Sequence, residues 1–180
     1  MNKKGNMYVA IILVLVFAFG FYISSRSPGV EISTPEKDTI LSEQDYQVDT
    51  GNGILTMGKS TWDEVALVYP EGKNLGMSTI FRPKRHNCLL TFSEDENILI
   101  KMHIDGDEPA SPRGVRVGDP YNLVEEGYGN DYTLIKNTGN DKDFDIVYGE
   151  NRSNSITFKI KNQRVNRIIV QEKYNSGQVI

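Results

Sequence analysis

The chain contains few of the residues that build metal centres and disulfide frameworks. Among its 180 residues there is one cysteine, Cys88, and there are two histidines, His86 and His103. A single cysteine excludes an internal disulfide, and a zinc site would have to recruit carboxylates as ligands. We therefore expect no metal and no cofactor.

The chain also lacks an excess of positive charge. Its 20 lysine and arginine residues are outnumbered by 24 aspartate and glutamate residues, which gives a formal net charge of −4. Domains that bind nucleic acid usually carry a basic face, so we expect no nucleic acid partner. The composition is otherwise that of a folded protein, with 38% hydrophobic and 9% aromatic residues.

One long apolar run lies near the N-terminus. Residues 7–23, MYVAIILVLVFAFGFYI, contain no charge and no proline, and Lys3 and Lys4 precede them. The run reaches the lower limit of about 17 residues for a helix that crosses a bilayer, and the lysines favour a cytoplasmic N-terminus. We expect a cytoplasmic tail at residues 1–6 and an uncleaved transmembrane signal anchor at residues 7–23. The protein would be a single-pass cell-membrane protein with an extracytoplasmic C-terminal domain; secretion after cleavage near residues 18–20 is the alternative.

The segment after this run predicts a flexible tether. Residues 24–52 contain Pro28, Pro35, several serines and threonines, and an excess of acidic residues. Such a composition offers too little apolar surface to offset the conformational entropy of the chain, so we expect it to be disordered. Residues 173–180 are expected to form a C-terminal tail.

The rest of the chain repeats one pattern, as repeat 1 at residues 53–109 and repeat 2 at residues 110–172. LTFSEDENILIKMHI, residues 90–104, aligns without a gap to ITFKIKNQRVNRIIV, residues 156–170. In both stretches two apolar runs flank a polar interruption, which is typical of a β-hairpin. We expect each repeat to be a diverged copy of one small α+β unit.

A helix-start motif precedes each predicted hairpin. In repeat 2 we expect Asp119 to cap the helix, Pro120 to occupy its first position and Gly129 to end it. In repeat 1 we expect Ser60 to be the cap and Asp63 to complete a variant capping box. The Gly-Asp-Pro sequence, residues 118–120, therefore predicts the start of a helix. It does not predict a phosphate loop, because the glycines and lysine of such a loop are missing.

Runs of apolar residues that alternate with polar ones predict the strands. They are residues 79–82, 87–93 and 98–104 in repeat 1, and residues 132–136, 143–148, 155–161 and 164–171 in repeat 2. The predicted fold class is α+β: an N-terminal transmembrane helix, then two diverged α-β-β-β(-β) repeats that form an antiparallel sheet with short helices on one face.

The order of these elements resembles a known superfamily. The residues that carry the resemblance are Gly58, Ser60, Val65 and Tyr69 in repeat 1, and Gly118, Pro120, Val124, Tyr128 and Gly129 in repeat 2. The pattern resembles the tandem helix-plus-antiparallel-sheet fold of the β-lactamase inhibitory protein and the small outer-membrane assembly lipoproteins. Both groups bind other proteins, so the resemblance implies this fold and a binding role. The chain departs from it, because such inhibitors carry disulfides and such lipoproteins a lipidated cysteine.

Three candidate sites have plainer interpretations. His86 and Cys88 resemble a base and a thiol nucleophile, but Cys88 precedes an apolar pair and is expected to be buried. Residues 141–145 place aspartates at alternate positions, but the glycine and glutamate of a calcium loop are missing further on. The basic loop at residues 82–86 fits either contact with an anionic partner or a solvated turn. We predict no catalytic residue and no enzyme activity.

The sheet face turned away from the helices is the predicted protein-binding surface. Residues such as Phe92, Ile100, Met102, Phe158 and Ile168 are expected to face the helices. The residues expected on the opposite face are Leu99, Lys101, His103, Lys159, Val165, Arg167 and Ile169. Their mixture of aliphatic and basic side chains indicates an interaction site, and ordinary scattered surface aliphatics are the alternative. The sheet edges could equally accept an extended peptide strand.

These features together predict a membrane-anchored extracytoplasmic protein-binding module with a regulatory, inhibitory or assembly role in the cell envelope. Its partner would be an envelope or extracellular protein. A cell-wall ligand-sensing or carboxylate-dependent hydrolytic domain is the first alternative, and a structural envelope subunit is the second. Paired carboxylates in a deep pocket would favour the hydrolytic alternative.

Overall fold

The computed structural model describes residues 29–37, 39–76, 79–95, 97–151 and 153–174. Residues 31–180 form one compact unit and residues 1–30 form another. Of the N-terminal unit only Gly29 and Val30 are described, so the fold is that of the larger unit.

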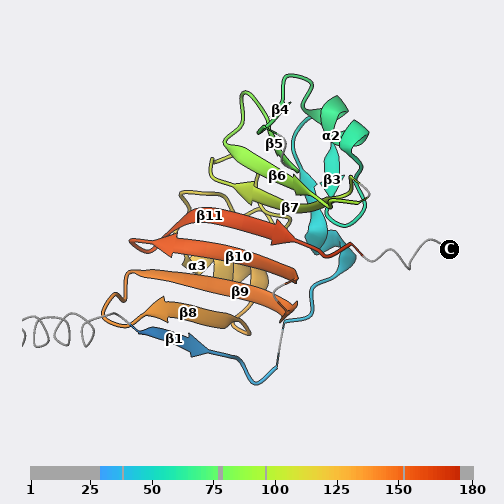
Figure 1. The fold of residues 1–180 in the computed structure, drawn as a ribbon. Coiled ribbons are helices and arrows are strands. Elements are labelled where there is room, and N and C mark those ends of the chain that lie inside the picture. The colour runs from blue at the N-terminus through green and yellow to red at the C-terminus, as the bar shows by residue number, and fades with distance from the viewer. Residues whose placement is uncertain (1–28, 38, 77–78, 96, 152, 175–180) are drawn as a thin grey trace, which may run out of the picture. The chain divides into compact units, whose positions relative to one another are not determined.

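The described chain contains eleven strands, two α-helices and one 3-10 helix. The strands are β1 (Val30–Ser33), β2 (Gln47–Asp49), β3 (Ile54–Thr56), β4 (Lys73–Asn74), β5 (Ile80–Arg82), β6 (Cys88–Phe92), β7 (Leu99–Ile104), β8 (Thr133–Asn137), β9 (Asp143–Asn151), β10 (Asn154–Lys161) and β11 (Arg164–Gln171). The helices are η1 (Glu43–Tyr46), α2 (Trp62–Val68) and α3 (Asn122–Tyr128). Nine strands form one sheet in the order β1-β8-β9-β10-β11-β7-β6-β5-β4, and β2 pairs with β3 (Figure 1).

The predicted fold class is corrected in its first element and in its balance of helix and sheet. The described chain is mostly antiparallel sheet, and its two α-helices have seven residues each. No helix among the described residues is long and apolar enough to cross a bilayer. The predicted span, residues 7–23, lies outside the described residues.

The same order of elements occurs twice: α2 is followed by β4 to β7, and α3 by β8 to β11. In each half the last strand bonds to the turn before the helix at a matching position. Gly58 donates its N–H to the carbonyl of Leu99 at 2.7 Å, and Gly118 donates to the carbonyl of Val165 at 2.7 Å. Leu99 and Val165 occupy equivalent positions in the two aligned sequences. The matching order and bonds are consistent with the predicted duplication, which stays a prediction.

The two halves join through their last strands, β7 and β11. The strands pair antiparallel, with His103 opposite Ile169. Ile104 lies opposite Ile168 on one side of that pair, and Met102 lies opposite Val170 on the other. Since the sequence alignment matches residue 102 to 168 and residue 104 to 170, the pairing is symmetric about the His103–Ile169 pair.

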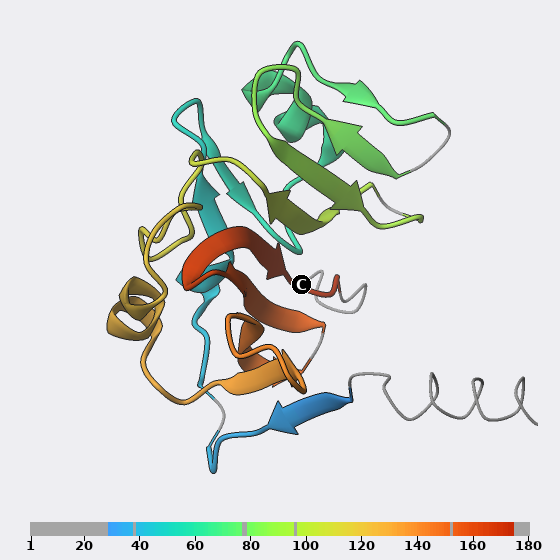
Figure 2. The same cartoon turned by 90° about the vertical axis from the view of Figure 1, so that its left-hand side faces the viewer.

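One core lies between the helices and one face of the sheet. The Tyr128 ring of α3 lies 5.1 Å from the ring of Phe158, and the Trp62 ring of α2 lies 4.8 Å from that of Phe92. Figures 1 and 2 show α3 on one side of β9, β10 and β11. The buried residues of β6, β7, β9, β10 and β11 are Cys88, Leu90, Phe92, Leu99, Met102, Ile104, Ile146, Tyr148, Ser155, Ile156, Phe158, Ile160, Val165, Ile168 and Val170.

The α-helices begin slightly later than the sequence predicts. Thr61 caps α2, where its backbone N–H donates to the Glu64 carboxylate at 2.7 Å and its hydroxyl accepts from the Glu64 N–H at 3.4 Å. This reciprocal capping box is one residue beyond the predicted pair. Asp119 serves the preceding turn, because its carboxylate accepts the N–H of Arg116 at 2.8 Å, and α3 begins after Tyr121.

The end of the predicted tether is folded. Residues 43–49 form η1 and β2, and Asp45, Tyr46 and Val48 are buried. The prediction of disorder assumed that the acidic side chains of this segment are exposed to solvent, and the Asp45 side chain is buried. Its side chain is 4% exposed and pairs with Arg113.

The Asp45–Arg113 pair fixes this segment against the second half of the chain. The guanidinium donates from Nε to Oδ1 at 2.7 Å and from Nη2 to Oδ2 at 2.9 Å, and it lies 4.7 Å from the centre of the Tyr128 ring. Burial raises the pKa of Asp45, but the hydrogen bonds from Arg113 and Ser42 outweigh it, so the pKa lies below its ordinary value. A two-point bond of this geometry is among the stronger polar contacts in proteins.

Removing Arg113 should destabilise the fold much more than removing an exposed arginine. Arg113→Ala leaves the buried Asp45 carboxylate without its positively charged partner, which we expect to lower the free energy of unfolding by about 3 kcal/mol. Arg116→Ala is the matched control, because its pair with Glu108 is exposed and contributes less than about 1 kcal/mol. Urea unfolding measures both values, and equal losses would contradict a structural role for the Asp45–Arg113 pair.

Candidate functional site

The face of the sheet opposite the helices carries a groove of about 600 Å³. Its floor is formed by the central strands, and residues of β1 and the turn after it form one side. The lining residues are Ile32, Thr34, Lys101, His103, Thr133, Ile135, Asp145, Val147, Gly149, Ser155, Thr157, Lys159, Ile169 and Gln171.

A row of directly paired side chains crosses this face. Residues opposite one another on neighbouring strands point to the same side of a sheet. The row runs from β8 to β6 as Thr133, Val147, Thr157, Ile169, His103 and Leu89. All six are half-buried, so the row is a shallow strip of aliphatic, threonine and histidine side chains.

Basic side chains flank this strip. Lys159 pairs with Asp145 at 2.7 Å, and Arg167 pairs with Asp105. Among the ion pairs of the described residues, none involves Lys101. Lys101 is therefore the cation on this face whose charge no described carboxylate neutralises.

His103 lies at the centre of the strip, where the two halves meet. Burial lowers the pKa of His103 below its ordinary value, and the positive charges of Arg167, Lys101 and Lys159 lower it further. The nearby Asp105 carboxylate opposes this change only in part. The imidazole is therefore neutral at neutral pH, and protonating it would add a charge to a surface that already carries three cations.

His103 should make the fold less stable as the pH falls. Because its pKa is lower in the folded chain, the unfolded chain binds the proton more readily, and stability declines as the pH drops below about 6.5. His103→Gln should remove the part of this decline that urea unfolding detects between about pH 7.5 and pH 5.5. His86→Gln, which leaves His103 in place, should keep the wild-type decline. An unchanged decline in His103→Gln would contradict the assignment.

The structure places five of the seven predicted site residues on the open face. Lys101, His103, Lys159 and Ile169 line the groove, and Arg167 lies opposite Lys159 on the same face. The other two predictions are wrong: Leu99 is 0% exposed and Val165 is 2% exposed, and both belong to the core.

A β-bulge in each half explains both errors. Thr91 pairs with Lys101 but Phe92 pairs with Leu99, so Ile100 is an extra residue in β7. Likewise one extra residue lies between the partners of Lys159 and Ile160 in β11. An extra residue inverts the alternation on one side of the bulge. Leu99 and Val165 therefore turn into the core, and Ile100, which was expected to face the helices, is only half-buried.

Sequence reasoning missed the contribution of β1, β8 and β9 to the groove. The alternation in residues 143–148 already placed Asp145 and Val147 opposite the apolar side chains, so a signal for these two was present. Ile32 and Thr34 belong to the segment that was predicted to be a tether, where no alternation distinguishes a four-residue strand from a disordered chain.

The His86–Cys88 pair does not form an activated nucleophile. Cys88 is buried, and burial raises the pKa of its thiol to about 12. The reactive form of cysteine is the thiolate, which is scarce at neutral pH when the pKa is this high. The His86 ring packs against the ring of Tyr69, with 5.0 Å between their centres.

Two of the three alternate aspartates, Asp143 and Asp145, have polar partners within the fold. The Asp143 carboxylate accepts from the side chain of Asn140 at 3.1 Å and from the N–H of Asn162 at 3.2 Å. Asp145 pairs with Lys159. In the part of the chain that the structure describes, no group of three or more histidine, cysteine, aspartate or glutamate side chains is arranged to hold a metal ion.

The basic loop at residues 82–86 borders a smaller pocket of about 240 Å³. Its Arg85 pairs with Glu71 at 3.1 Å, and both side chains are at least half exposed. This pairing offsets part of the positive charge that suggested an anionic partner.

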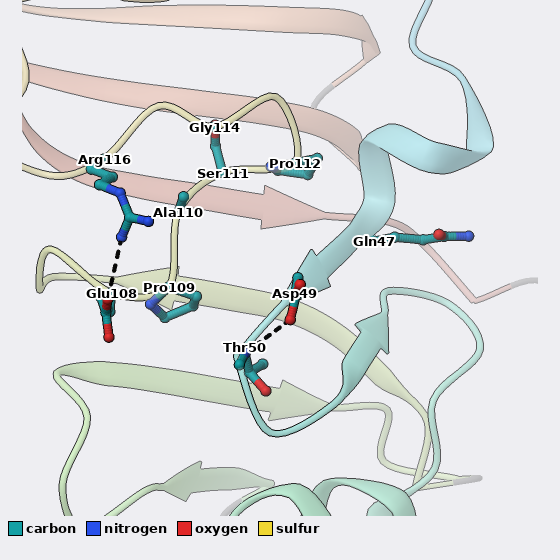
Figure 3. Close-up of a pocket in the computed structure, with 11 residues that line it drawn as sticks. Gln47, Asp49, Thr50, Glu108, Pro109, Ala110, Ser111, Pro112, Gly114 and Arg116 are labelled. Carbon is teal, nitrogen blue, oxygen red and sulfur yellow. Dashed lines mark hydrogen bonds and ion pairs between the residues drawn. The ribbon is translucent and has the colours of Figure 1, made fainter.

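A second pocket, of about 390 Å³, lies between the β2–β3 turn and the connection from β7 to α3 (Figure 3). Figure 3 shows its two carboxylates turned to protein partners. Glu108 lies 3.6 Å from the Arg116 guanidinium, and Asp49 accepts the N–H of Gly51 at 2.9 Å. Both acidic residues are exposed, unlike the buried acid that glycoside hydrolysis needs.

The comparisons with known proteins find no match: no family model fits the chain, and no curated protein and no solved structure is significantly similar to it. The resemblance to the β-lactamase inhibitory protein and the assembly lipoproteins stays a prediction, as does a location outside the cytoplasm.

Proposed function

We propose that the protein is a module that binds another protein, and that the partner covers the open face of the sheet. The observation that carries this proposal is the half-buried strip from Thr133 to Leu89 with basic residues beside it. A solvated sheet face would carry mostly polar side chains. Here aliphatic, threonine and basic side chains alternate across strands from both halves.

The dimensions of the strip favour a macromolecule over a small ligand. It crosses six strands, and neighbouring strands lie about 4.8 Å apart, so it spans about 24 Å. Small-molecule sites are enclosed pockets that bury most of their ligand. A shallow strip of this length can instead bury a segment of a partner protein along the whole strip.

The charges on this face indicate the chemistry of the partner. Lys159 and Arg167 already have carboxylate partners, whereas Lys101 has no described ion-pair partner. A partner segment with aliphatic side chains over Val147 and Ile169 and one carboxylate near Lys101 would match these positions. The contact would then combine burial of apolar surface with one new ion pair.

The test is a photo-crosslinking comparison in the native host extract. A crosslinking amino acid at Thr157, in the middle of the strip, should capture a defined protein. Lys101→Glu combined with Ile169→Asp should weaken that capture at least about tenfold, because residues at the centre of an interface dominate its binding energy. Lys142→Glu is the control, since Lys142 is exposed in a turn away from the groove and should leave capture unchanged.

The same variants separate this proposal from its alternatives. Capture that survives Lys101→Glu with Ile169→Asp would show that the open face is not the contact surface. Capture of a second copy of the chain, together with concentration-dependent sedimentation, would instead support the structural-subunit alternative.

A further inference from the structure

The strand at one edge of the large sheet is weakly held. β1 lies beside β8 at the end of the strand order, and all of its residues are exposed. Ile32 is 54% exposed, so the strand buries little side-chain surface. Its attachment therefore rests mainly on backbone pairing with β8.

The described polar contacts of this segment are few and lie at the surface, whereas Leu41, beyond β1, is half-buried and packs against the core. Glu31 pairs with Lys136 of β8 at 3.4 Å, with side-chain exposures of 55% and 31%. Further along, Thr39 donates its hydroxyl to the carbonyl of Asp131. Among the described residues of 31–44 none is buried, and the first buried side chain is Asp45. Detaching β1 would therefore leave the core closed.

The strand beneath β1 is better anchored. The first four residues of β8 are half-buried, and Thr133 and Ile135 line the groove. Without β1, β8 would present its unpaired N–H and C=O groups beside that groove. The opposite edge of the sheet differs, because β4 has only two residues and begins with Lys73, a combination that discourages strand addition.

We propose that the edge of β8 is a strand-accepting site, which β1 occupies in the free protein and which an extended segment of a partner protein takes over. β1 itself shows what the edge accepts: in Val-Glu-Ile, two aliphatic residues flank a carboxylate that meets Lys136. The partner segment carries the same pattern, in which two aliphatic residues flank a carboxylate. Backbone bonds supply its affinity and Lys136 selects the acidic position.

β1 also regulates the site. A strand on a short tether competes at an effective concentration of about millimolar. A free segment therefore binds the intact protein more weakly than it binds a chain whose β1 cannot pair. This site differs from the open face, because it uses backbone groups along the sheet edge, and either site can exist without the other.

The experiment uses the full chain with Ile32→Pro, made together with Glu31→Pro throughout, because one of two consecutive residues in an edge strand directs its N–H toward the neighbouring strand, and proline at that position removes the bond. The probe is the isotopically unlabelled peptide GVEISTPE, which has the sequence of residues 29–36. NMR should show saturable shifts of the β8 amides at or below about millimolar peptide, and at least about tenfold weaker binding to the wild-type chain.

A charge exchange tests the assigned chemistry. Adding Lys136→Glu to Ile32→Pro should weaken binding of GVEISTPE and strengthen binding of GVKISTPE, each by about two- to fivefold, as for an exposed ion pair. Absence of saturable binding to Ile32→Pro, or affinities that do not depend on the charge at position 136, would overturn the proposal.

Hydrogen exchange in the wild-type chain tests the same idea without a substitution. The amides of β8 that face β1 should exchange at least about tenfold faster than the amides of β10, which open only with the core. Equal protection of the two strands would overturn a displaceable β1, even if Ile32→Pro failed to fold. A wild-type chain that sediments as a dimer by exchanging β1 between copies would assign the edge to a second copy and overturn the partner assignment.

Discussion

The pairing of β7 with β11 is the contact on which the rest of the structure depends. It joins two small helix-and-sheet units along their last strands, with Met102 and Val170 on one side of the His103–Ile169 pair and Ile104 and Ile168 on the other. Neither unit alone has a wide sheet. Joined, they bury one face against both helices and leave one continuous open face, whose strip of side chains draws on both units.

The pairing of β7 with β11 also explains the distribution of charge on the open face. Lys101 and Arg167 occupy equivalent positions in the two halves, so the symmetric pairing brings both cations close to His103. Burial lowers the pKa of His103 most, and these two charges lower it further. Asp105, which follows β7, neutralises Arg167. The result is a surface with one cation whose charge the described carboxylates leave available, beside a strip of aliphatic, threonine and histidine side chains. The proposed contact with another protein would use this combination.

The sequence predicted the strands well and some of their faces badly, for a physical reason. Alternation located the ends of β5 to β11 within one residue, except that β9 continues three residues beyond its predicted end, and the ungapped alignment matched β7 to β11 correctly. In β6 and β10 the sequence alignment is wrong by two residues. It matches Phe92 to Phe158, whereas the strand pairing matches Phe92 to Ile160, because Phe92 pairs with Leu99 and Ile160 pairs with Val165. A shift of two keeps every face, which is why core residues such as Phe158 were still identified. A bulge shifts the strand register by one residue, which moves the side chains beyond it to the opposite face. Its position depends on tertiary contacts that the alternation of residues does not reveal.

A buried ion pair cannot be recognised from composition either, so the ordered segment around Asp45 was missed.

The pairing of β7 with β11 can be measured directly by nuclear Overhauser effects between backbone protons across the two strands of the full chain. The structure predicts cross-strand contacts between residues 102 and 170, between 103 and 169, and between 104 and 168. Strong contacts within each hairpin without any between β7 and β11 would mean that the two halves form separate sheets, and no continuous open face would exist.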